Sequence, residues 1–256
     1  MKKFFAFASL LALTLSACSD DVAQSEQKGE GQVTITLATS AEVDTRAQIS
    51  CTTPVLEDFA LTIEGVGYDY AKEYASISEF DADNYLRFGQ YRATVVAGDV
   101  MNEGYDKAAF VGSAEFSVSP RQNTEVEVTA YIANALVKVE VTEAFETYFV
   151  GGHTLKLTTA AGNEFDVTEQ TEPIFIAPAA FTISGTAVKQ PNQSGAEGTV
   201  VTLPEYKNDE AKAQTFYTVK FDVENAGRAQ LTITLNDTLV ESIDIEQELN
   251  DNSENA

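Results

Sequence analysis

The sequence predicts an all-β protein made of two tandem β-sandwiches that follow an N-terminal signal peptide. Three observations predict this fold class. Apolar residues alternate with polar ones along most of the chain, which places each apolar set on one face of a strand. Clusters of Gly, Asn, Asp and Pro separate these runs at short intervals. One stretch has a helical pattern, residues 143–149, with Thr142 in position to cap it.

The first group of strands occupies residues 31–133. Its alternating apolar positions fall in the runs 33–37, 59–63, 86–97, 116–118 and 126–132. Turn signals stand between them, and about seven short strands with this spacing predict a β-sandwich. We therefore expect an N-terminal sandwich over residues 31–133.

A second group of strands begins at Asn134. Alternation recurs in the runs 137–141, 155–157, 165–167, 181–183, 219–223 and 231–235. Asn236-Asp237 is typical of a tight turn between two strands. We expect a C-terminal sandwich over residues 134–248, followed by an acidic tail over residues 249–256.

The N-terminus has the pattern of an export signal. Lys2 and Lys3 precede an uncharged run over residues 4–17, which has the length of a signal-peptide core and is too short to span a bilayer. The run ends in Leu15-Ser16-Ala17-Cys18, which matches the bacterial lipobox. We predict a lipoprotein signal peptide over residues 1–17, lipid attachment at Cys18 and a flexible tether over residues 18–30; the alternative is an ordinary signal peptide with a chance cysteine.

The residues after the lipobox are polar and acidic. Ser19, Asp20 and Asp21 resemble the short export signal of surface lipoproteins in Bacteroidota-type bacteria. The alternative is a plain solvated tether. The first interpretation predicts a lipid-anchored protein of the outer membrane that faces the cell surface, with the membrane as its partner through the anchor.

Composition argues against several functional classes. The net charge of −24 would repel nucleic-acid phosphates, so we expect no nucleic-acid partner. His153, the only histidine, follows a Gly-Gly pair and is expected in a solvated loop; no histidine-based metal site or catalytic relay is expected in one chain. Asp81-Ala82-Asp83-Asn84 has alternating oxygen ligands but lacks the rest of a calcium loop, which favours a plain acidic turn. We predict no enzyme activity, no catalytic residue, no metal and no cofactor.

Several segments in a fixed order resemble an uncharacterised family of two-domain surface lipoproteins from Bacteroidota, similar in style to the fimbrillins. The segments that carry the resemblance are the lipobox, Gly31 to Leu37, Asp44 to Ala47, Asp58 to Ile63, Leu86 with Gly89 to Ala93, Gly104 to Gly112, and Asn134 to Phe149. The resemblance implies transthyretin-like or fimbrillin-like sandwiches. The family has no assigned catalytic residues, so it implies none here.

The same resemblance singles out Arg46. In fimbrillin-type pilins an arginine after the first strand is a processing site, and its cleavage opens a groove for a partner's strand. Cleavage after Arg46 would remove residues 33–37 and leave sheet edges that a donor strand could pair with. The alternative is a solvated linker arginine in a permanently anchored protein.

Two functions fit these features, and a third fits them poorly. The first is a membrane-anchored surface lipoprotein with a structural or adhesive role, an accessory of fimbria-like assemblies, with other surface or fimbrial proteins as partners. The alternative is a surface glycan-binding lipoprotein that supports nutrient uptake, with Tyr68, Tyr70 and Tyr74 as a candidate aromatic platform in a chain without Trp. A hydrolase lacks any nucleophile–base motif here.

Overall fold

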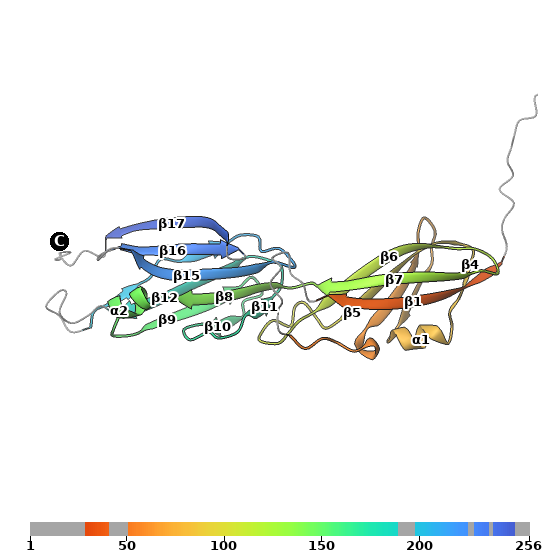
Figure 1. Ribbon diagram of the computed structural model, residues 1–256, viewed down its shortest axis with the longest axis horizontal. Helices are drawn as coiled ribbons and strands as arrows, with labels where there is room; N and C mark the ends of the chain where they lie inside the picture. Colours follow the sequence, from red (N-terminus) through yellow and green to blue (C-terminus); the bar gives the residue numbers. More distant parts are fainter. Residues whose placement is uncertain (1–28, 41–50, 189–197, 225–227, 236–237, 249–256) are drawn as a thin grey trace, which may run out of the picture.

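The structure is a computed structural model that describes residues 29–40, 51–188, 198–224, 228–235 and 238–248. It confirms the all-β prediction, because strands make up three sheets and the described helices are short. In Figure 1 one sheet lies at the right and two packed sheets lie at the left, end to end with it. No helix in these ranges has the length and apolar character needed to cross a membrane.

The N-terminal sheet has seven strands in the order β3-β2-β5-β6-β7-β1-β4. The strands are β1 (Glu30–Ser40), β2 (Ala60–Gly65), β3 (Ala71–Tyr74), β4 (Tyr85–Arg87), β5 (Gly89–Ala97), β6 (Phe110–Val118) and β7 (Asn123–Ile132). Most neighbours are antiparallel, but β1 runs parallel to β7 from Gln32, opposite Asn123, to Ser40, opposite Tyr131. β1, the first described strand, therefore lies between β7 and β4 in the sheet.

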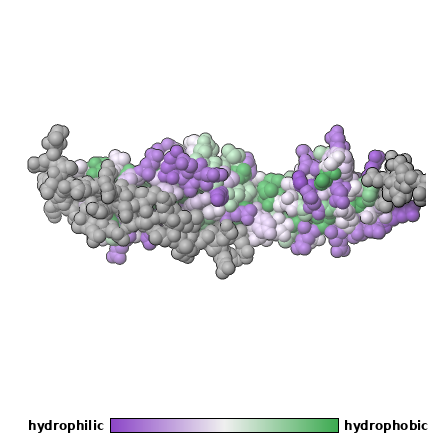
Figure 2. Space-filling view, turned by 90° about the horizontal axis from the view of Figure 1, so that it is seen from above, coloured by the Kyte–Doolittle hydropathy of each residue, from purple (hydrophilic) through white to green (hydrophobic). Residues whose placement is uncertain are grey.

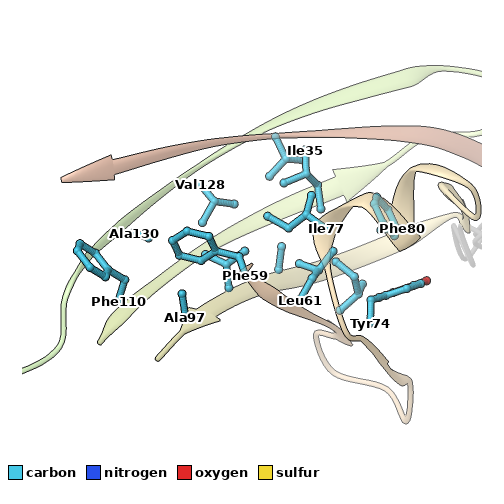
Figure 3. Close-up of a cluster of buried hydrophobic side chains, with 14 of the residues drawn as sticks. Ile35, Phe59, Leu61, Tyr74, Ile77, Phe80, Ala97, Phe110, Val128 and Ala130 are labelled. Carbon is cyan, nitrogen blue, oxygen red and sulfur yellow. The ribbon is translucent and has the colours of Figure 1, made fainter. Parts of the chain in front are cut away.

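The core of this sheet comes from its alternating residues. Tyr91, Ala93 and Val95 of β5 are buried while the residues between them are more exposed, as the sequence predicted. Figure 3 shows side chains of β1, β2, β7 and the helix α1 (Ile77–Asp81) directed at one another, among them Ile35, Leu61 and Ile77. One curled sheet thus encloses its own apolar cluster, with α1 contributing Ile77 and Phe80.

Two local predictions in this region were wrong. The helix α1, which connects β3 to β4, was not expected. A 3-10 turn over Leu56–Asp58, which precedes β2, was not expected either. The run 86–97 was expected to be one strand, but it divides at Phe88 into β4 and β5. The division has a physical cause: the Phe88 N–H donates to the Gly29 carbonyl, so β4 stays on β1 while β5 crosses to pair with β2 and β6.

The C-terminal residues form a sandwich of two five-stranded sheets. One sheet contains β8 (Ala135–Val141), β11 (Ile174–Ile176), β15 (Phe216–Glu224), β16 (Arg228–Leu235) and β17 (Thr238–Glu248), in the order β11-β8-β15-β16-β17. The other follows the path β10-β9-β12-β13, with β14 also paired to β12; these strands are β9 (His153–Thr159), β10 (Glu164–Asp166), β12 (Phe181–Val188), β13 (Val200–Thr202) and β14 (Tyr206–Asn208).

The two sheets of the sandwich share one apolar cluster. Val137 of β8 and Val219 of β15 meet Leu157 of β9 and Ile183 of β12 in it. The predicted helical turn is confirmed as α2 (Glu143–Tyr148), and the Thr142 hydroxyl accepts a hydrogen bond from the Phe145 N–H at 3.1 Å. Phe145, the residue that this cap fixes in place, is buried in the same cluster.

The N-terminal sheet and the sandwich are joined by a bridge at Gly104 and Phe175. Each residue donates its backbone N–H to the carbonyl of the other, with both N–O distances at 2.9 Å. Glu103 adds three hydrogen bonds: its carboxylate accepts from the Thr159 hydroxyl at 2.6 Å, from the Asn163 amide at 2.8 Å and from the Ala177 N–H at 2.9 Å. Phe175 itself belongs to the apolar cluster of the N-terminal sheet.

Asn134 lies between β7 and β8 and is fully buried. Its Oδ1 accepts a hydrogen bond from the Ala109 N–H at 2.6 Å, and its Nδ2 lies 3.5 Å from the Ile176 carbonyl, to which it donates. Its backbone carbonyl accepts from the Gln214 N–H at 2.8 Å. One polar residue therefore ties three segments distant in sequence to the junction.

Several predictions concern residues outside the described ranges: the signal peptide, most of the tether, the turn at Asn236-Asp237 and the acidic tail. The domain boundaries at 31, 133 and 248 stay predictions. Leu136 and Phe175 belong to the N-terminal cluster although they follow residue 133, so the two apolar clusters interlock along the chain.

We expect Asn134→Ala to lower the free energy of unfolding by about 1–3 kcal/mol, because the buried Ala109 N–H would lose its acceptor. Urea unfolding followed by circular dichroism measures this loss. Asn102→Ala removes an exposed amide and should change the free energy by less than about 0.5 kcal/mol. Equal effects of the two substitutions would contradict the role given to Asn134.

Candidate functional site

The residues predicted to carry anchoring and processing lie outside the described ranges. These are Cys18, the export residues Ser19, Asp20 and Asp21, and Arg46. Their roles stay predictions. The structure does describe the strand between them, β1, whose first residue is Glu30 and whose last is Ser40.

The three tyrosines proposed as a glycan platform do not form one. Tyr74 is only 6% exposed and packs edge-on against Phe80. Tyr68 and Tyr70 each pack edge-on against the buried Tyr91, with ring centroids 5.6 and 5.4 Å apart. The rings of Tyr68 and Tyr70 therefore pack at the edge of the apolar core, and the ring of Tyr74 is part of that core.

Three other singled-out residues have structural partners. His153 is the first residue of β9 and half-buried, not in a solvated loop; its Nε2 lies 3.4 Å from the Thr168 carbonyl and its ring meets the Phe145 ring edge-on. Burial is the main cause that raises the pKa of the Cys51 thiol, and the nearby Asp106 carboxylate raises it further. Asp83, in the acidic turn, forms an ion pair with Lys72 that lowers the pKa of its carboxyl. Within the described ranges no group of three or more His, Cys, Asp or Glu could hold a metal ion.

A shallow pocket of about 580 Å³ lies on the outer face of the sheet that contains β9 and β12. The strand register sets its floor, because Lys156 of β9 pairs with Ser184 of β12, and Thr154 pairs with Thr186. Asp166 of β10 and Thr202 of β13 extend these rows on either side. The apolar residues of the same strands that do not line the pocket, such as Leu157 and Ile183, point to the core instead.

The polar groups of the pocket are linked to one another. Lys156 Nζ lies 2.7 Å from Glu164 Oε1, and the hydroxyls of Thr154 and Thr186 lie 2.9 Å apart. Hydrogen bonds from Thr168, first from its backbone N–H, lower the pKa of the Asp166 carboxyl. The pocket therefore offers hydroxyls, two charged carboxylates and an ammonium group in one open hollow.

This group of donors and acceptors suits a polyhydroxylated ligand. Sugar hydroxyls both donate and accept, so they match Thr and Ser hydroxyls beside charged groups. Phe165 is the aromatic residue among those lining the pocket, and it is half-buried against the core of the sandwich. A sugar bound here would depend on hydrogen bonds more than on ring stacking. Sequence reasoning missed this site because polar Thr and Lys on the outer face of a strand are typical of any solvated sheet.

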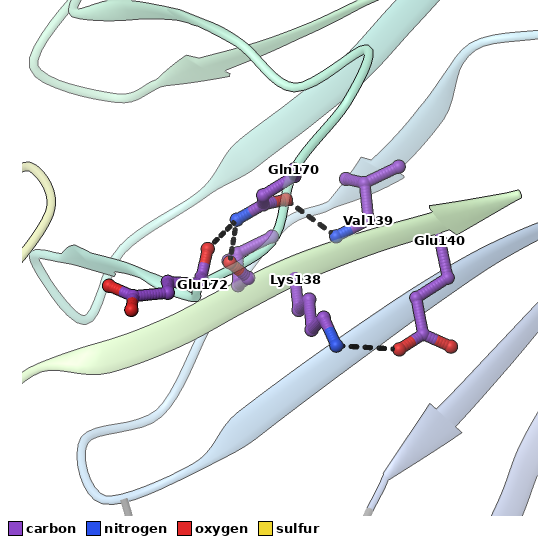
Figure 4. A network of polar contacts seen from close by, with 6 residues as sticks. Lys138, Val139, Glu140, Gln170 and Glu172 are labelled. Atoms are coloured by element: carbon purple, nitrogen blue, oxygen red, sulfur yellow. Dashed lines mark hydrogen bonds and ion pairs between the residues drawn. The ribbon is translucent and has the colours of Figure 1, made fainter. Parts of the chain in front are cut away.

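A second hollow, of about 670 Å³, follows the edge of β8 beside residues 168–171. Gln170 closes part of this edge (Figure 4): its Oε1 accepts from the Val139 N–H at 2.7 Å, and its Nε2 donates to the Val137 carbonyl at 2.9 Å. The side-chain amide takes the positions of a neighbouring strand, where β11 no longer pairs with β8. Such protection of an edge limits unwanted strand pairing.

A family profile described as "Domain of unknown function (DUF4493)" matches residues 29–251. The chain belongs to this family. The match confirms the resemblance to an uncharacterised family, and it covers β1 to β17. No curated protein matches the sequence.

Several solved structures from Bacteroides are similar to this chain over most of its length. A proposed cell adhesion protein from Bacteroides eggerthii has 10% identity and a TM-score of 0.45, over 83% of this chain and 97% of that one. A proposed adhesin from Bacteroides ovatus has 9% identity and a TM-score of 0.39, over 84% and 95%. Proposed polysaccharide binding proteins from Bacteroides thetaiotaomicron give 9% and 0.39, over 85% and 99%. At these identities and scores the likenesses say nothing about what this member of the DUF4493 family binds.

Proposed function

We propose that this DUF4493 protein is a lipid-anchored surface protein with a structural or adhesive role, attached through Cys18 to the outer membrane. The sequence supports the anchor, through the lipobox and the polar residues that follow it. The role is proposed to be non-enzymatic, with neighbouring surface proteins or fimbria-like assemblies as partners.

One observation carries the proposal: the chain enters the N-terminal sheet at its outer end, at Gly29 and the start of β1 (Figure 1). An anchor attached there would hold the N-terminal sheet near the membrane and direct the sandwich away from it. The hydrogen-bonded junction at Glu103 and Asn134 would transmit that orientation. A tethered body that projects its far end is suited to contact with other surfaces.

Cys18→Ser should abolish acylation, so the protein should leave the membrane fraction and lose its acyl mass. Cell fractionation and mass spectrometry of the intact protein measure this. Asp20→Ala with Asp21→Ala should keep the lipid but reduce cleavage by protease added to intact cells, if these residues direct export. A Cys18→Ser protein that still fractionates with membranes, alongside an unacylated natural form, would refute the anchor.

The glycan-binding alternative has a different site from the one first expected. The pocket on β9 and β12, with Lys156, Glu164 and Asp166, favours it in place of the tyrosines. Its open shape and paired charges would suit a chain of sugars passing over the sheet. In this alternative the anchored protein would collect glycans for uptake.

If the alternative holds, the detergent-solubilised full-length protein should bind members of a polysaccharide array, and Lys156→Met should weaken binding about tenfold or more, because a charged hydrogen bond contributes about 1.5–3 kcal/mol. Lys72→Met is the matched control, since Lys72 is also ion-paired and has an exposed fraction of 46%, against 48% for Lys156. Absence of any bound glycan, or equal binding by both variants, would reject this site.

Arg46 keeps two interpretations: a linker arginine, or a processing site that admits a donor strand. The arrangement of β1 bears on the second. Val33 and Ile35 of β1 are buried, and β1 covers the edge of β7 from Asn123 to Tyr131. Loss of β1 would therefore uncover both a hydrogen-bonding edge and an apolar groove, which an extended strand could occupy.

Processing predicts a species that starts at Ala47 in surface material from native cells, and its absence from an Arg46→Ala strain. N-terminal mass spectrometry detects it. High-molecular-weight assemblies should contain the Ala47 species and not the Cys18 species. Assemblies or surface protein in which every chain begins at acylated Cys18 would leave Arg46 as a linker residue.

A further inference from the structure

The outer end of the N-terminal sheet carries a group of exposed apolar side chains, here called the aromatic tip: Val66, Tyr68, Tyr85 and Phe88. Their exposed fractions are 41%, 43%, 60% and 47%. They come from the β2–β3 connection, from β4 and from the residue between β4 and β5. Three aromatic residues exposed at one end are unusual in a chain with a net charge of −24.

The aromatic tip lies beside the point where the chain enters the sheet. The Phe88 N–H donates to the Gly29 carbonyl at 2.8 Å, and Tyr85 pairs with Gln32 of β1. The Val66 N–H donates to the Gln90 carbonyl at 2.8 Å, which places the β2–β3 connection against the start of β5. The tip and Gly29 therefore share one end of the molecule.

Tyr68 is held in place by the residues around it. The Tyr68 ring packs edge-on against Tyr91. A Cβ at position 89 would lie 2.7 Å from the Tyr68 hydroxyl, so any residue other than Gly89 would require the Tyr68 side chain to move. Burial, followed by a hydrogen bond with Tyr91, raises the pKa of the Tyr68 phenol, which therefore stays neutral. The tip thus presents a fixed ring with one polar atom, as interfacial tyrosines do.

Charged residues of both signs lie near the tip. Arg87 and Arg121 are exposed at this end, as are Glu30 and Asp69. Arg121 is fixed next to the entry point, because its N–H donates to the Glu30 carbonyl. Two basic residues therefore accompany the acidic ones at this end of a chain whose net charge is −24.

The covalent distance to the predicted anchor is short. Ten residues lie between Cys18 and Gly29, which are therefore eleven steps apart along the backbone. A fully extended segment of that length spans at most about 40 Å. A patch tethered so close to a bilayer meets it at a high effective concentration, so even a weak affinity for lipid would keep it bound.

We propose that the aromatic tip docks on the membrane that holds the Cys18 lipid, with Tyr68, Tyr85 and Phe88 at the level of the lipid headgroups. The inference rests on the proposed anchor at Cys18. Aromatic rings of this kind concentrate at the membrane–water interface because one part is apolar and the other is polar. Docking gives the anchored body a second contact with the bilayer, which sets the direction in which the sandwich projects.

The chain contains no Trp, so a single introduced Trp reports on its own surroundings. The full-length acylated protein with Phe88→Trp is placed in phosphatidylethanolamine vesicles that contain phosphatidylcholine brominated near the headgroup. Docking predicts a blue shift and loss of most of the emission. Tyr85→Trp should show the same blue shift and the same quenching, so the conclusion does not depend on one variant folding correctly.

Tyr131→Trp is the matched control. Tyr131 is an aromatic residue of β7 with an exposed fraction of 43%, at the opposite end of the strand from Asn123. It lies about 26 Å along β7 from Asn123 at the usual rise per residue of a strand. Its emission should be the same in brominated and unbrominated vesicles.

The outcomes separate the docking from the anchor. Acylated protein that binds vesicles with unquenched Trp at positions 88 and 85 overturns the docking and leaves the anchor intact. If the Trp emission shifts to the blue without quenching by brominated lipid, and the shift grows with the number of protein molecules per vesicle, a second copy of the protein covers the tip. That result also overturns the docking. Protein without acyl mass at Cys18 that fails to bind vesicles refutes the anchor, and the docking with it.

Discussion

The buried amide of Asn134 links the two halves of this molecule, together with the contacts of Glu103 and the Gly104–Phe175 bridge. Its oxygen satisfies the buried Ala109 N–H and its nitrogen faces the Ile176 carbonyl, so neither segment can shift without leaving a polar group unpaired away from water. The Glu103 carboxylate and the Gly104–Phe175 bridge surround this contact with further hydrogen bonds. A rod made of two β bodies keeps a fixed direction only if its junction is fixed, and here a fully buried, hydrogen-bonded amide stands beside the partly exposed hydrogen bonds of Glu103.

The junction gives each end of the molecule a separate task in the proposed function. The end at Gly29 receives the tether and carries the aromatic tip, while the pocket with Lys156 and Asp166 lies on the sandwich beyond the junction. The coloured surface in Figure 2 is largely hydrophilic, with small hydrophobic areas between the purple ones. On this face, that distribution suits a body that stays dispersed in solution.

Much of the fold follows from local signals. Alternation along β5 identified the buried face, and Thr142 marked the start of α2. The helix α1 also had a signal, since Ser76 and Glu79 have the spacing of a capping box. In the structure the Ser76 side chain makes no capping hydrogen bond, and Glu79 accepts instead from the Ala75 N–H, at 3.0 Å. That helix is one short turn and a half, too brief for hydrophobic periodicity to reveal it.

The sequence by itself determined the strand faces and the capped helix, and it predicts an export signal, because each of these depends on residues close together along the chain. Tertiary structure decided the rest. Tyr74 is buried because Phe80 packs on it, and the run at Phe88 divides because Gly29 captures its N–H. The pocket, the junction and the aromatic tip each bring together strands that are far apart in sequence. Their positions depend on which strands pair and in what register, and a single sequence does not specify this pairing.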